Sequence, residues 1–351
     1  MPRLNRICGK EKTMRKISLI CALLAIALLI GPAYALAAEK PRKVRIGYLS
    51  LVNAQLIAKN LKLHEKEMGV EIEWYRFNSG RDVNTAMASG SLDFGNVGLP
   101  PVAIGISGNL TYWGILNANV LGAGEALVVR NNINSLKDLE GKTVVAPFGS
   151  TTHYLIMKAM IDAGVDISKV KLMDMAPGEA LAPFIRGDID AAYIWEPSLG
   201  HVVANGGKIL LTSADMARQG YLTWDIISVQ PEFANKYPDL VKKFIKSELA
   251  AMEYWEANPE KSAEIITEEL GGISVDDARR MMRGTVLVKL DDQLSAAYLG
   301  TSQKKGRTAK DIVAVARFLQ EQGRIKNPVT LEMAEKFLHP EFLEAVKAEA
   351  P

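Results

Sequence analysis

Cysteine is nearly missing from this 351-residue chain, because its two cysteines, Cys8 and Cys21, both lie within the first 37 residues. Without that segment the chain can form no disulfide, thiolate nucleophile or cysteine-ligated metal site. Histidine is scarce too, with four in the whole chain, and their positions show neither metal-ligand spacing nor a Ser-His-Asp arrangement. We therefore expect no catalytic residue, no metal and no cofactor.

A long apolar segment is also missing. The chain opens with six basic residues, followed by a short apolar run over 17–30, then Gly31-Pro32 and the small-residue series Ala35-Leu36-Ala37. The run is too short for a good membrane span, and this order of features is typical of a secretory signal peptide. We expect residues 1–37 to be cleaved and the rest of the chain to be exported.

The chain without its first 37 residues has no excess of positive charge. That segment holds six of the 42 Lys and Arg and one of the 40 Asp and Glu, so 36 basic and 39 acidic residues remain, a formal net charge of −3. A clustered basic surface is the usual mark of a nucleic-acid-binding protein. We therefore expect no nucleic-acid partner.

Strand and helix patterns alternate from Val44 to about Ser213, which predicts strand-helix units with mainly parallel sheets. From Pro231 onward, apolar residues recur at helical spacing, so we expect a helical C-terminal region. The segments expected to be strands are VRIGYL, VEIEWYRF, LDFGNV, LTYWGILN, TVVAP, VKLMDM, IDAAYIW and KILLTS.

An internal correspondence indicates two similar domains. Gly90, Asp93 and Pro100 recur, at the same offsets of three and ten residues, as Gly187, Asp190 and Pro197. Both sets are typical of a helix that ends at glycine, a short buried strand and a new helix entered through proline. Open α/β domains bind ligands at the carboxyl ends of their strands, so we expect the site in a cleft between the two domains.

The stretch VVAPFGSTTHYLIMKAM, residues 144–160, predicts a strand followed by a helix with Ser150 as N-cap. The hydroxyl groups of Ser150, Thr151 and Thr152 and the free N–H groups of the first turn would then form an anion site. The alternative is that Ser150 only caps the helix. His153 fits a packed or ligand-touching role better than a catalytic one.

Two acidic residues lie next to or within apolar segments near the expected cleft. Glu196 comes after a strand and before Pro197, and it serves either as a helix cap or as a cation ligand. Asp225 sits in an apolar run, where a charge needs a partner. Anion donors facing carboxylates describe a site for a zwitterion. Three aromatic residues are candidates for the cleft wall or for the core, namely Tyr154, Trp195 and Trp224.

These residues carry a resemblance to a known family. The chain resembles the periplasmic substrate-binding proteins of ABC importers for taurine, alkanesulfonates and nitrate, most closely the taurine-binding branch. The segments that carry the resemblance are FNSGRDVNTAMASGSLDFGNVG, GEALVV, LEGKTVVAPFGSTTHYLIMKAM, RGDIDAAYIWEP and the Trp-Asp of LTWDIIS.

The resemblance implies a type II periplasmic binding fold, with two doubly wound domains, two hinge crossovers near Val129 and Ile226, and a helical C-terminal region. We expect domain 1 to comprise residues 42–129 and 229–351, and domain 2 to comprise residues 130–228. The protein would act in the periplasm as a monomer and deliver its ligand to an ABC permease in the inner membrane, as part of sulfur metabolism.

The resemblance also implies roles for residues at matching positions. Ser150, Thr151, Thr152 and His153 would bind the sulfonate, and Asp225, with Glu196, would bind the ammonium group. The chain departs from the family where Gly98-Leu99-Pro100-Pro101 replaces a segment richer in hydroxyls, so the first domain's grip on the anion is weaker or comes from the loop between Ser50 and Asn53.

Two other functions stay open at this point. A periplasmic sensor domain for a small anion has the same sequence features. An enzyme that resembles thiamine-pyrimidine synthase shares the fold class, but it typically uses a cysteine-rich segment, which this chain lacks once residues 1–37 are removed.

Overall fold

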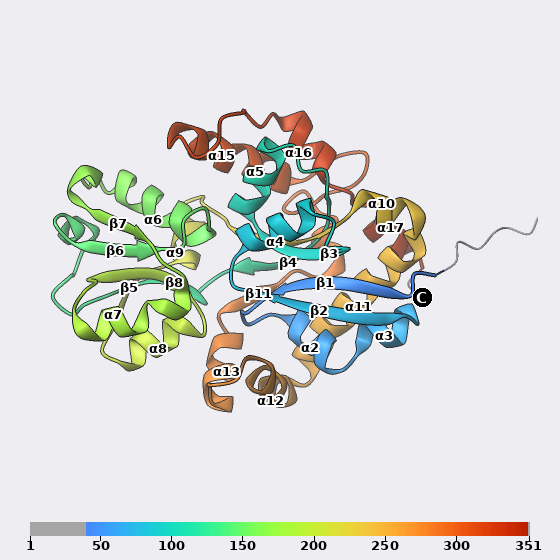
Figure 1. The fold of residues 1–351 in the computed structure, drawn as a ribbon, viewed down its shortest axis with the longest axis horizontal. Coiled ribbons are helices and arrows are strands. Elements are labelled where there is room, and N and C mark those ends of the chain that lie inside the picture. The colour runs from blue at the N-terminus through green and yellow to red at the C-terminus, as the bar shows by residue number, and fades with distance from the viewer. Residues whose placement is uncertain (1–39, 350–351) are drawn as a thin grey trace, which may run out of the picture. The chain divides into compact units, whose positions relative to one another are not determined.

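The computed structural model describes residues 40–349, so the expected signal peptide lies outside the described residues. Two β-sheets, each flanked by helices, dominate this part of the chain (Figure 1). The first sheet has the order β11-β4-β10-β3-β1-β2, and the second has the order β7-β6-β8-β5-β9. Among the described residues, no helix combines the length and hydropathy needed to cross a bilayer.

The first sheet is built from two parts of the chain that lie before and after the segment forming the second sheet. Its strands are β1 (Lys43–Leu49), β2 (Glu71–Phe77), β3 (Phe94–Gly98), β4 (Trp113–Leu121), β10 (Trp224–Val229) and β11 (Thr285–Leu287). The helices between its first strands are α2 (Ala54–Asn60), α3 (Leu63–Met68), α4 (Gly80–Ala88) and α5 (Leu99–Ser107).

The second sheet is built from one continuous segment. Its strands are β5 (Glu125–Val129), β6 (Thr143–Ala146), β7 (Lys171–Asp174), β8 (Ala191–Trp195) and β9 (Lys208–Thr212). Its α-helices are α6 (Thr151–Asp162), α7 (Leu181–Arg186), α8 (Ser198–Ala204) and α9 (Ser213–Arg218), and its 3-10 turns are η1 (Leu136–Leu139), η2 (Ile167–Lys169) and η3 (Pro177–Glu179).

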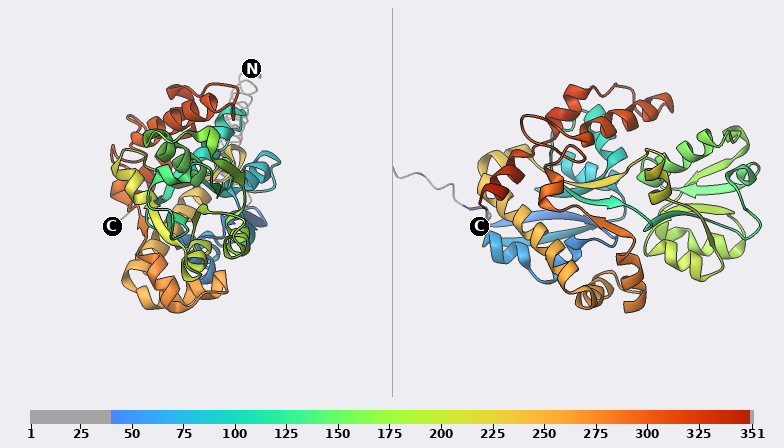
Figure 2. Two further views of the ribbon diagram at one scale, coloured as in Figure 1. Left: turned by 90° about the vertical axis from the view of Figure 1, so that its left-hand side faces the viewer. Right: turned by 180° about the vertical axis from the view of Figure 1, so that it is seen from behind.

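The C-terminal region is mostly helical, as expected. It contains α10 (Pro231–Lys236), α11 (Pro238–Ala257), α12 (Pro259–Leu270), α13 (Val275–Met282), α14 (Leu290–Gln293), α15 (Arg307–Glu321), α16 (Leu331–Phe337) and α17 (Glu341–Ala348). Helix α11 packs against α2 and α3, and α15 packs against α5, so helices cover both faces of the first sheet (Figures 1 and 2).

The sheets are mixed, which corrects the expectation of mainly parallel sheets. β1 pairs in parallel with β2 and β3, and β6 pairs in parallel with β7 and β8. In the first sheet β10 pairs antiparallel with both β3 and β4, and β11 pairs antiparallel with β4. In the second sheet β5 pairs antiparallel with both β8 and β9. β5 and β10 each follow a crossover from the other sheet, and an apolar run does not reveal the direction in which its strand enters a sheet.

The internal correspondence is present in the structure. Gly90 and Gly187 both have positive φ, at 68° and 93°. Asp93 Oδ2 accepts the N–H of Arg45 in β1 at 2.8 Å, and Asp190 Oδ2 accepts the N–H of Thr143 in β6 at 2.9 Å. Each aspartate therefore fastens the start of one strand, β3 or β8, to its parallel neighbour, β1 or β6, in the same way in both halves.

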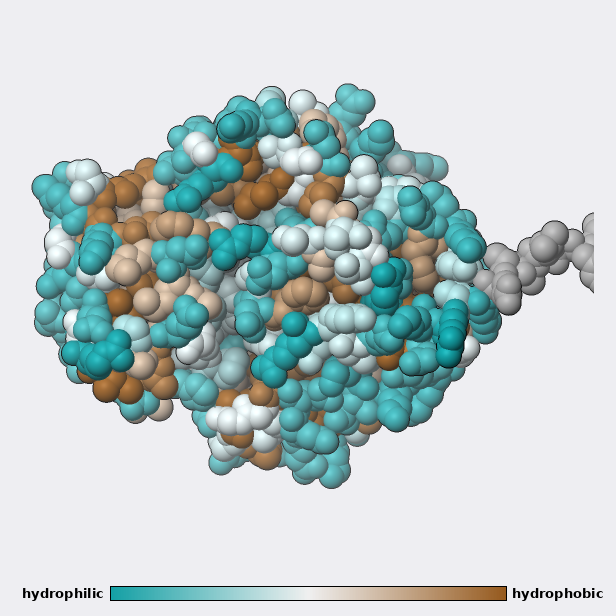
Figure 3. Space-filling view, in the orientation of Figure 1, coloured by the Kyte–Doolittle hydropathy of each residue, from teal (hydrophilic) through white to brown (hydrophobic). Residues whose placement is uncertain are grey.

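Alternate residues along β5 face opposite layers of helices, as the strand period requires. Ala126 and Val128 pack with Phe184 and Leu199 in one core cluster, whereas Leu127 belongs to the other. Outside, hydrophilic residues cover most of the face seen in the space-filling view, and hydrophobic residues form separate patches on it (Figure 3). The large apolar side chains that are exposed lie on different elements, for example Tyr75 on β2 and Ile185 on α7.

The sheets assign β5 to the second half and β10 to the first. The predicted domain boundaries after residues 129 and 228 stay a prediction, and this assignment favours boundaries a few residues earlier in each case. The chain then passes between the sheets after β4, through residues 122–124, and again between α9 and β10.

Candidate functional site

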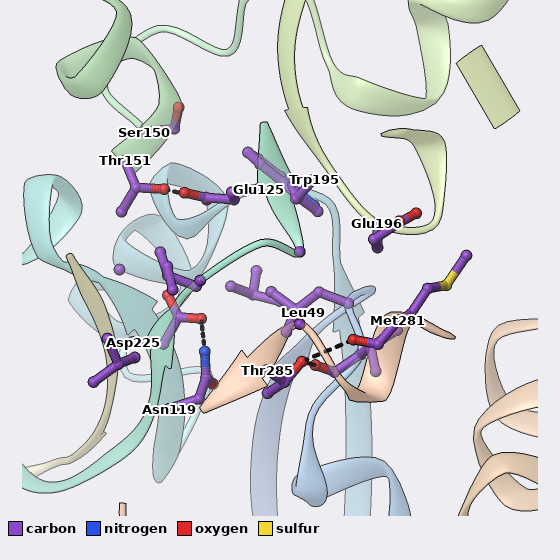
Figure 4. A pocket seen from close by; sticks show the side chains of 18 of the residues that line it. Leu49, Asn119, Glu125, Ser150, Thr151, Trp195, Glu196, Asp225, Met281 and Thr285 are labelled. Carbon is purple, nitrogen blue, oxygen red and sulfur yellow. Dashed lines mark hydrogen bonds between the residues drawn. The ribbon is translucent and has the colours of Figure 1, made fainter. Parts of the chain in front are cut away.

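One pocket lies where the carboxyl ends of strands from both sheets meet (Figure 4). β1 ends at Leu49, β3 at Gly98 and β8 at Trp195, and all three residues line it. The space between the lining residues, including the part open to solvent, is about 660 Å³. Ligands of open α/β sheets bind at this edge.

Several of the predicted site residues come together in this pocket. Those that line it are Gly98, Ser150, Thr151, Trp195, Glu196 and Asp225. The middle of the pocket is apolar, since its other lining residues include Leu49, Leu51, Val52, Leu121 and Met281. None of the lining residues is Lys or Arg, although three are carboxylates.

Helix α6 begins where the sequence predicted. Ser150 is its N-cap, and the Ser150 Oγ accepts the N–H of His153 at 3.2 Å. The N–H groups of Thr151 and Thr152 belong to the first turn, where a helix has no acceptor of its own. Ser150 is thus a cap that also lines the pocket, so the capping and the binding interpretation are compatible.

The hydroxyl group of Thr151 contacts a carboxylate that the sequence analysis missed. The Thr151 Oγ1 donates to Oε1 of Glu125 at 2.5 Å (Figure 4). The Ser213 Oγ donates to Oε2 at 2.9 Å. Glu125 is 4% exposed and lines the pocket from the start of β5. Glu125 could have been predicted from the segment GEALVV, because it is an acid at the start of an apolar strand. The same feature led to the prediction for Asp225.

Burial raises the pKa of Glu125 to about 8, against the opposing effect of the Thr151 and Ser213 hydroxyls, with Asp225 adding to the rise. A buried carboxylate without a cation favours its neutral form, because the charged form loses its hydration. Burial therefore favours the protonated form of Glu125, and an approaching cation would favour the ionised form.

Asp225 lies at the start of β10 and is 3% exposed. Its Oδ2 accepts the Asn119 Nδ2–H at 3.3 Å, and burial raises its pKa to about 6. Gly98 stands beside its other oxygen, because a Cβ built on Gly98 would lie 3.2 Å from Oδ1 and 3.3 Å from Thr151 Cγ2. Asp225 and Glu125 thus approach Thr151 from different sides.

Glu196 lines the pocket, but both of its oxygens already have partners. Oε2 accepts the N–H of Gly200 in α8 at 2.8 Å, and Oε1 pairs with Arg280 Nη1 of α13 at 2.7 Å. Glu196 therefore acts as the helix cap that was its alternative interpretation, and it links the second sheet to the C-terminal region. Its predicted role as a cation ligand has no support in this geometry.

The remaining predicted residues do not line the pocket. Burial lowers the pKa of His153 to about 4, with the Arg324 charge contributing, and its ring packs on Phe148. Trp224 is fully buried and donates its indole N–H to Asp311 at 3.4 Å. Ser50 accepts from Arg76, and Asn53 stands at the N-cap position of α2 without a side-chain hydrogen bond to the helix. Leu99 and Thr152 are fully buried, and Tyr154 packs on Phe318.

The C-terminal region supplies lining residues that sequence reasoning missed. Met281, Gly284 and Thr285, at the end of α13 and the start of β11, close one side of the pocket. Thr285 Oγ1 lies 3.4 Å from the carbonyl oxygen of Val52. These residues follow the other lining residues by about sixty positions, and no local pattern places α13 at the cleft.

Comparison with known proteins agrees with this geometry. Residues 37–268 match the NMT1-like family. The taurine-binding periplasmic protein of Escherichia coli K12 is 33% identical over 287 residues, which cover 80% of this chain and 87% of that protein. This relative is a binding protein, which confirms the prediction that the chain is not an enzyme.

Solved structures show the same fold. The alkanesulfonate-binding protein of Xanthomonas axonopodis pv. citri bound to MOPS has a TM-score of 0.73 at 19% identity, and the match covers 86% of this chain and 99% of that one. The aliphatic sulphonate-binding protein of Escherichia coli has a TM-score of 0.69 at 20% identity, covering 84% and 92%. The chain has the two-domain periplasmic binding fold, and it belongs to the NMT1-like family.

Proposed function

We propose that the chain is the periplasmic substrate-binding component of an ABC importer and that it binds taurine or a related small organosulfonate or zwitterion. The observation that carries the proposal is that Asp225 and the first turn of α6 line the same pocket. The names of the taurine-binding relative and of the alkanesulfonate-binding structures support it.

The two ends of an aminosulfonate have complementary partners in this pocket. The free N–H groups of the first turn of α6 and the positive end of its dipole favour the sulfonate. The carboxylate of Asp225 favours the ammonium group through a charge-assisted hydrogen bond. Because no Lys or Arg lines the pocket, backbone and hydroxyl donors carry the anion end.

Apolar side chains fit the short hydrocarbon part of such a ligand. Trp195 enters from the second sheet, and Leu49 and Leu121 enter from the first. Burying two methylene groups between them contributes about 0.8 kcal/mol each. The polar groups at the two ends of the pocket then determine the orientation of the ligand, and the apolar residues between them determine how long a hydrocarbon part it can have.

Transport requires export and an opening of the cleft. A signal peptide at residues 1–37 would deliver the protein to the periplasm, where a monomer would present its ligand to the permease. Residues 122–124 and the segment between α9 and β10 are the places where the chain crosses between the sheets, so they would act as hinges for ligand-selected closure.

Titration calorimetry on the exported chain tests the proposal. We expect taurine to bind more tightly than longer alkanesulfonates, nitrate and neutral amino acids. Asp225→Asn should weaken taurine binding by about 2 kcal/mol, because it removes a charged hydrogen-bond partner, and it should spare ethanesulfonate, which has no ammonium group.

Asp239→Asn is the matched control, since Asp239 has the same charge but its side chain is 81% exposed on α11. It should bind taurine as the wild type does. If taurine and ethanesulfonate bind the wild type equally well, Asp225 does not recognise an ammonium group. If neither binds, the organosulfonate proposal is wrong.

A further inference from the structure

The structural correspondence between the two halves extends to the two buried carboxylates. In the first sheet the antiparallel strand β10 lies beside β3, in the order β10-β3-β1-β2. In the second sheet the antiparallel strand β5 lies beside β8, in the equivalent order β5-β8-β6-β7. β10 and β5 thus occupy the same position in each half.

The registers place an acid at the same point of both strands. Asp225 pairs with Gly98, the last residue of β3, and Glu125 pairs with Trp195, the last residue of β8. Each acid therefore lies at the edge of its sheet where the parallel strands end, beside the last residue of β3 or of β8. The two halves contribute one carboxylate each to the same pocket.

Hydroxyl groups of two residues fix both oxygens of Glu125. Each of its two oxygens accepts a hydroxyl hydrogen, from Thr151 and from Ser213. The Tyr193 hydroxyl lies 3.1 Å from the Ser213 Oγ, and because Ser213 uses its hydrogen on Glu125, Tyr193 donates to Ser213. Three hydroxyl groups thus orient a buried acid whose counter-ion is not among the pocket's side chains.

Asp225 is held more loosely, by one amide donor on Oδ2. Its Oδ1 has no hydrogen-bond donor among the described residues and lies next to Gly98, where the missing side chain leaves room. Oδ1 is therefore the open acceptor on the first-sheet side of the pocket. Glu125, fixed by its hydroxyl donors, is the acceptor on the second-sheet side.

From these contacts we infer that Glu125 is a second specificity-determining residue, and that the pocket selects ligands with a primary or secondary ammonium group bound between Glu125 and Asp225. This inference rests on the proposed function and narrows its ligand class to aminosulfonates and related amines. An ammonium nitrogen has several N–H donors, so it can serve one acceptor from each half at once.

Ligand binding and closure are then coupled through charge. Two acids that face one pocket repel each other when both are ionised, so the empty pocket resists closure in that form. An ammonium group replaces this repulsion with two attractions, which favours the closed state. A plain sulfonate brings no such gain and instead adds a third negative charge.

The same arrangement predicts that a proton leaves on binding. The ionisable groups that act on Glu125 are Asp225 and, through Ser213, Tyr193. With a pKa of about 8 in the empty pocket, Glu125 is mostly protonated at pH 7. The ligand's cation favours the ionised form, so the Glu125 proton passes to the buffer as the ammonium group binds.

Calorimetry at pH 7 in two buffers of different ionisation enthalpy, phosphate and Tris, measures both effects. The wild type should release close to one proton per taurine bound. Glu125→Gln should bind taurine at least tenfold more weakly and release clearly less, and its affinity for ethanesulfonate should be unchanged or higher. Equal taurine affinity in wild type and Glu125→Gln would overturn the inference.

Glu248→Gln is the matched control, because Glu248 is also a buried acid, 1% exposed, but pairs with His64 away from the pocket. It should leave taurine binding unchanged, and a loss equal to that of Glu125→Gln would contradict a specific role. If the Glu125→Gln chain does not fold, the wild-type ligand preference decides, since equal affinity for taurine and ethanesulfonate overturns the inference.

Tests with other ligands separate this inference from the proposed function. If ethanolamine binds but neither a sulfonate nor β-alanine does, the proposed function fails, and an unchanged affinity of Glu125→Gln for ethanolamine would overturn the inference as well. If ethanesulfonate or nitrate binds and no ammonium compound does, the inference fails and the sulfonate proposal stands. If the wild type binds none of these compounds, both are wrong.

Discussion

The hydroxyl groups at the start of α6 have two different roles, one in the helix and one in the pocket. Ser150 caps the helix, whereas Thr151 donates its hydroxyl hydrogen to Glu125. What remains for a ligand anion is the N–H groups of the first turn and the helix dipole. At the scale of single residues, the anion and cation partners of the pocket therefore meet at Thr151.

The buried acids make the stability of the ligand-free protein depend on pH. The folded pKa of Glu125, about 8, lies above its ordinary 4.5, and that of Asp225, about 6, lies above 3.8. The folded state therefore binds these protons more tightly than the unfolded state. Their contribution is fully present below about pH 4 and is lost as pH rises, through about 6 for Asp225 and about 8 for Glu125.

Urea unfolding of the wild type and of Glu125→Gln at pH 5, 6.5 and 8 checks this sign. The free energy of unfolding of the wild type, relative to the variant, should fall by on the order of a few kcal/mol across this range. Two curves that run parallel with pH would show that Glu125 is ionised in the empty pocket.

At the scale of elements, local patterns predicted the repeat well. The N-cap at Ser150, the C-terminal glycines of α4 and α7 and the short strands β3 and β8 depend on nearby residues, so they could be read from the sequence. β5 was missed as a strand because it is five residues long and entirely buried, so it shows no alternation. The expectation of mainly parallel sheets was wrong for another reason, because strand pairing depends on segments that are distant in the sequence.

The turn between α13 and β11 packs directly on the crossover between the sheets. A Cβ on Gly284 would lie 2.8 Å from the backbone nitrogen of Gly124 and 3.2 Å from the carbonyl carbon of Ala123. This crossover leads into β5 and hence to Glu125. Glycine at position 284 thus permits a close backbone contact next to the pocket.

Gly284→Ala should lower the free energy of unfolding by about 1–3 kcal/mol, because the backbone must shift to admit the methyl group. Gly178→Ala is the control, since a Cβ there meets no atom within 4 Å, and it should be neutral or slightly stabilising. Urea unfolding measures both. Equal stability of the two variants would contradict the tight packing of this turn.

At the scale of the whole molecule, the sequence predicted the architecture and one of the two buried carboxylates that would face a ligand cation. Asp225 and the start of α6 were expected at the cleft and lie in one pocket. Glu125, Met281 and Arg280 were not expected, because their proximity depends on strand pairing and on the packing of α13. The role of Glu196 as a cation ligand stays a prediction, and its contact with Arg280 could not be foreseen because the two residues are 84 positions apart in the sequence.

The central claim is that a small dipolar ligand is neutralised at both ends, with its cation between two carboxylates that the two halves contribute. A crystal structure of the exported chain with taurine measures this directly. The account predicts the ligand nitrogen within about 3 Å of oxygens of both Glu125 and Asp225, and the sulfonate at the first turn of α6. A nitrogen that faces solvent, or a sulfonate against the two carboxylates, would contradict it.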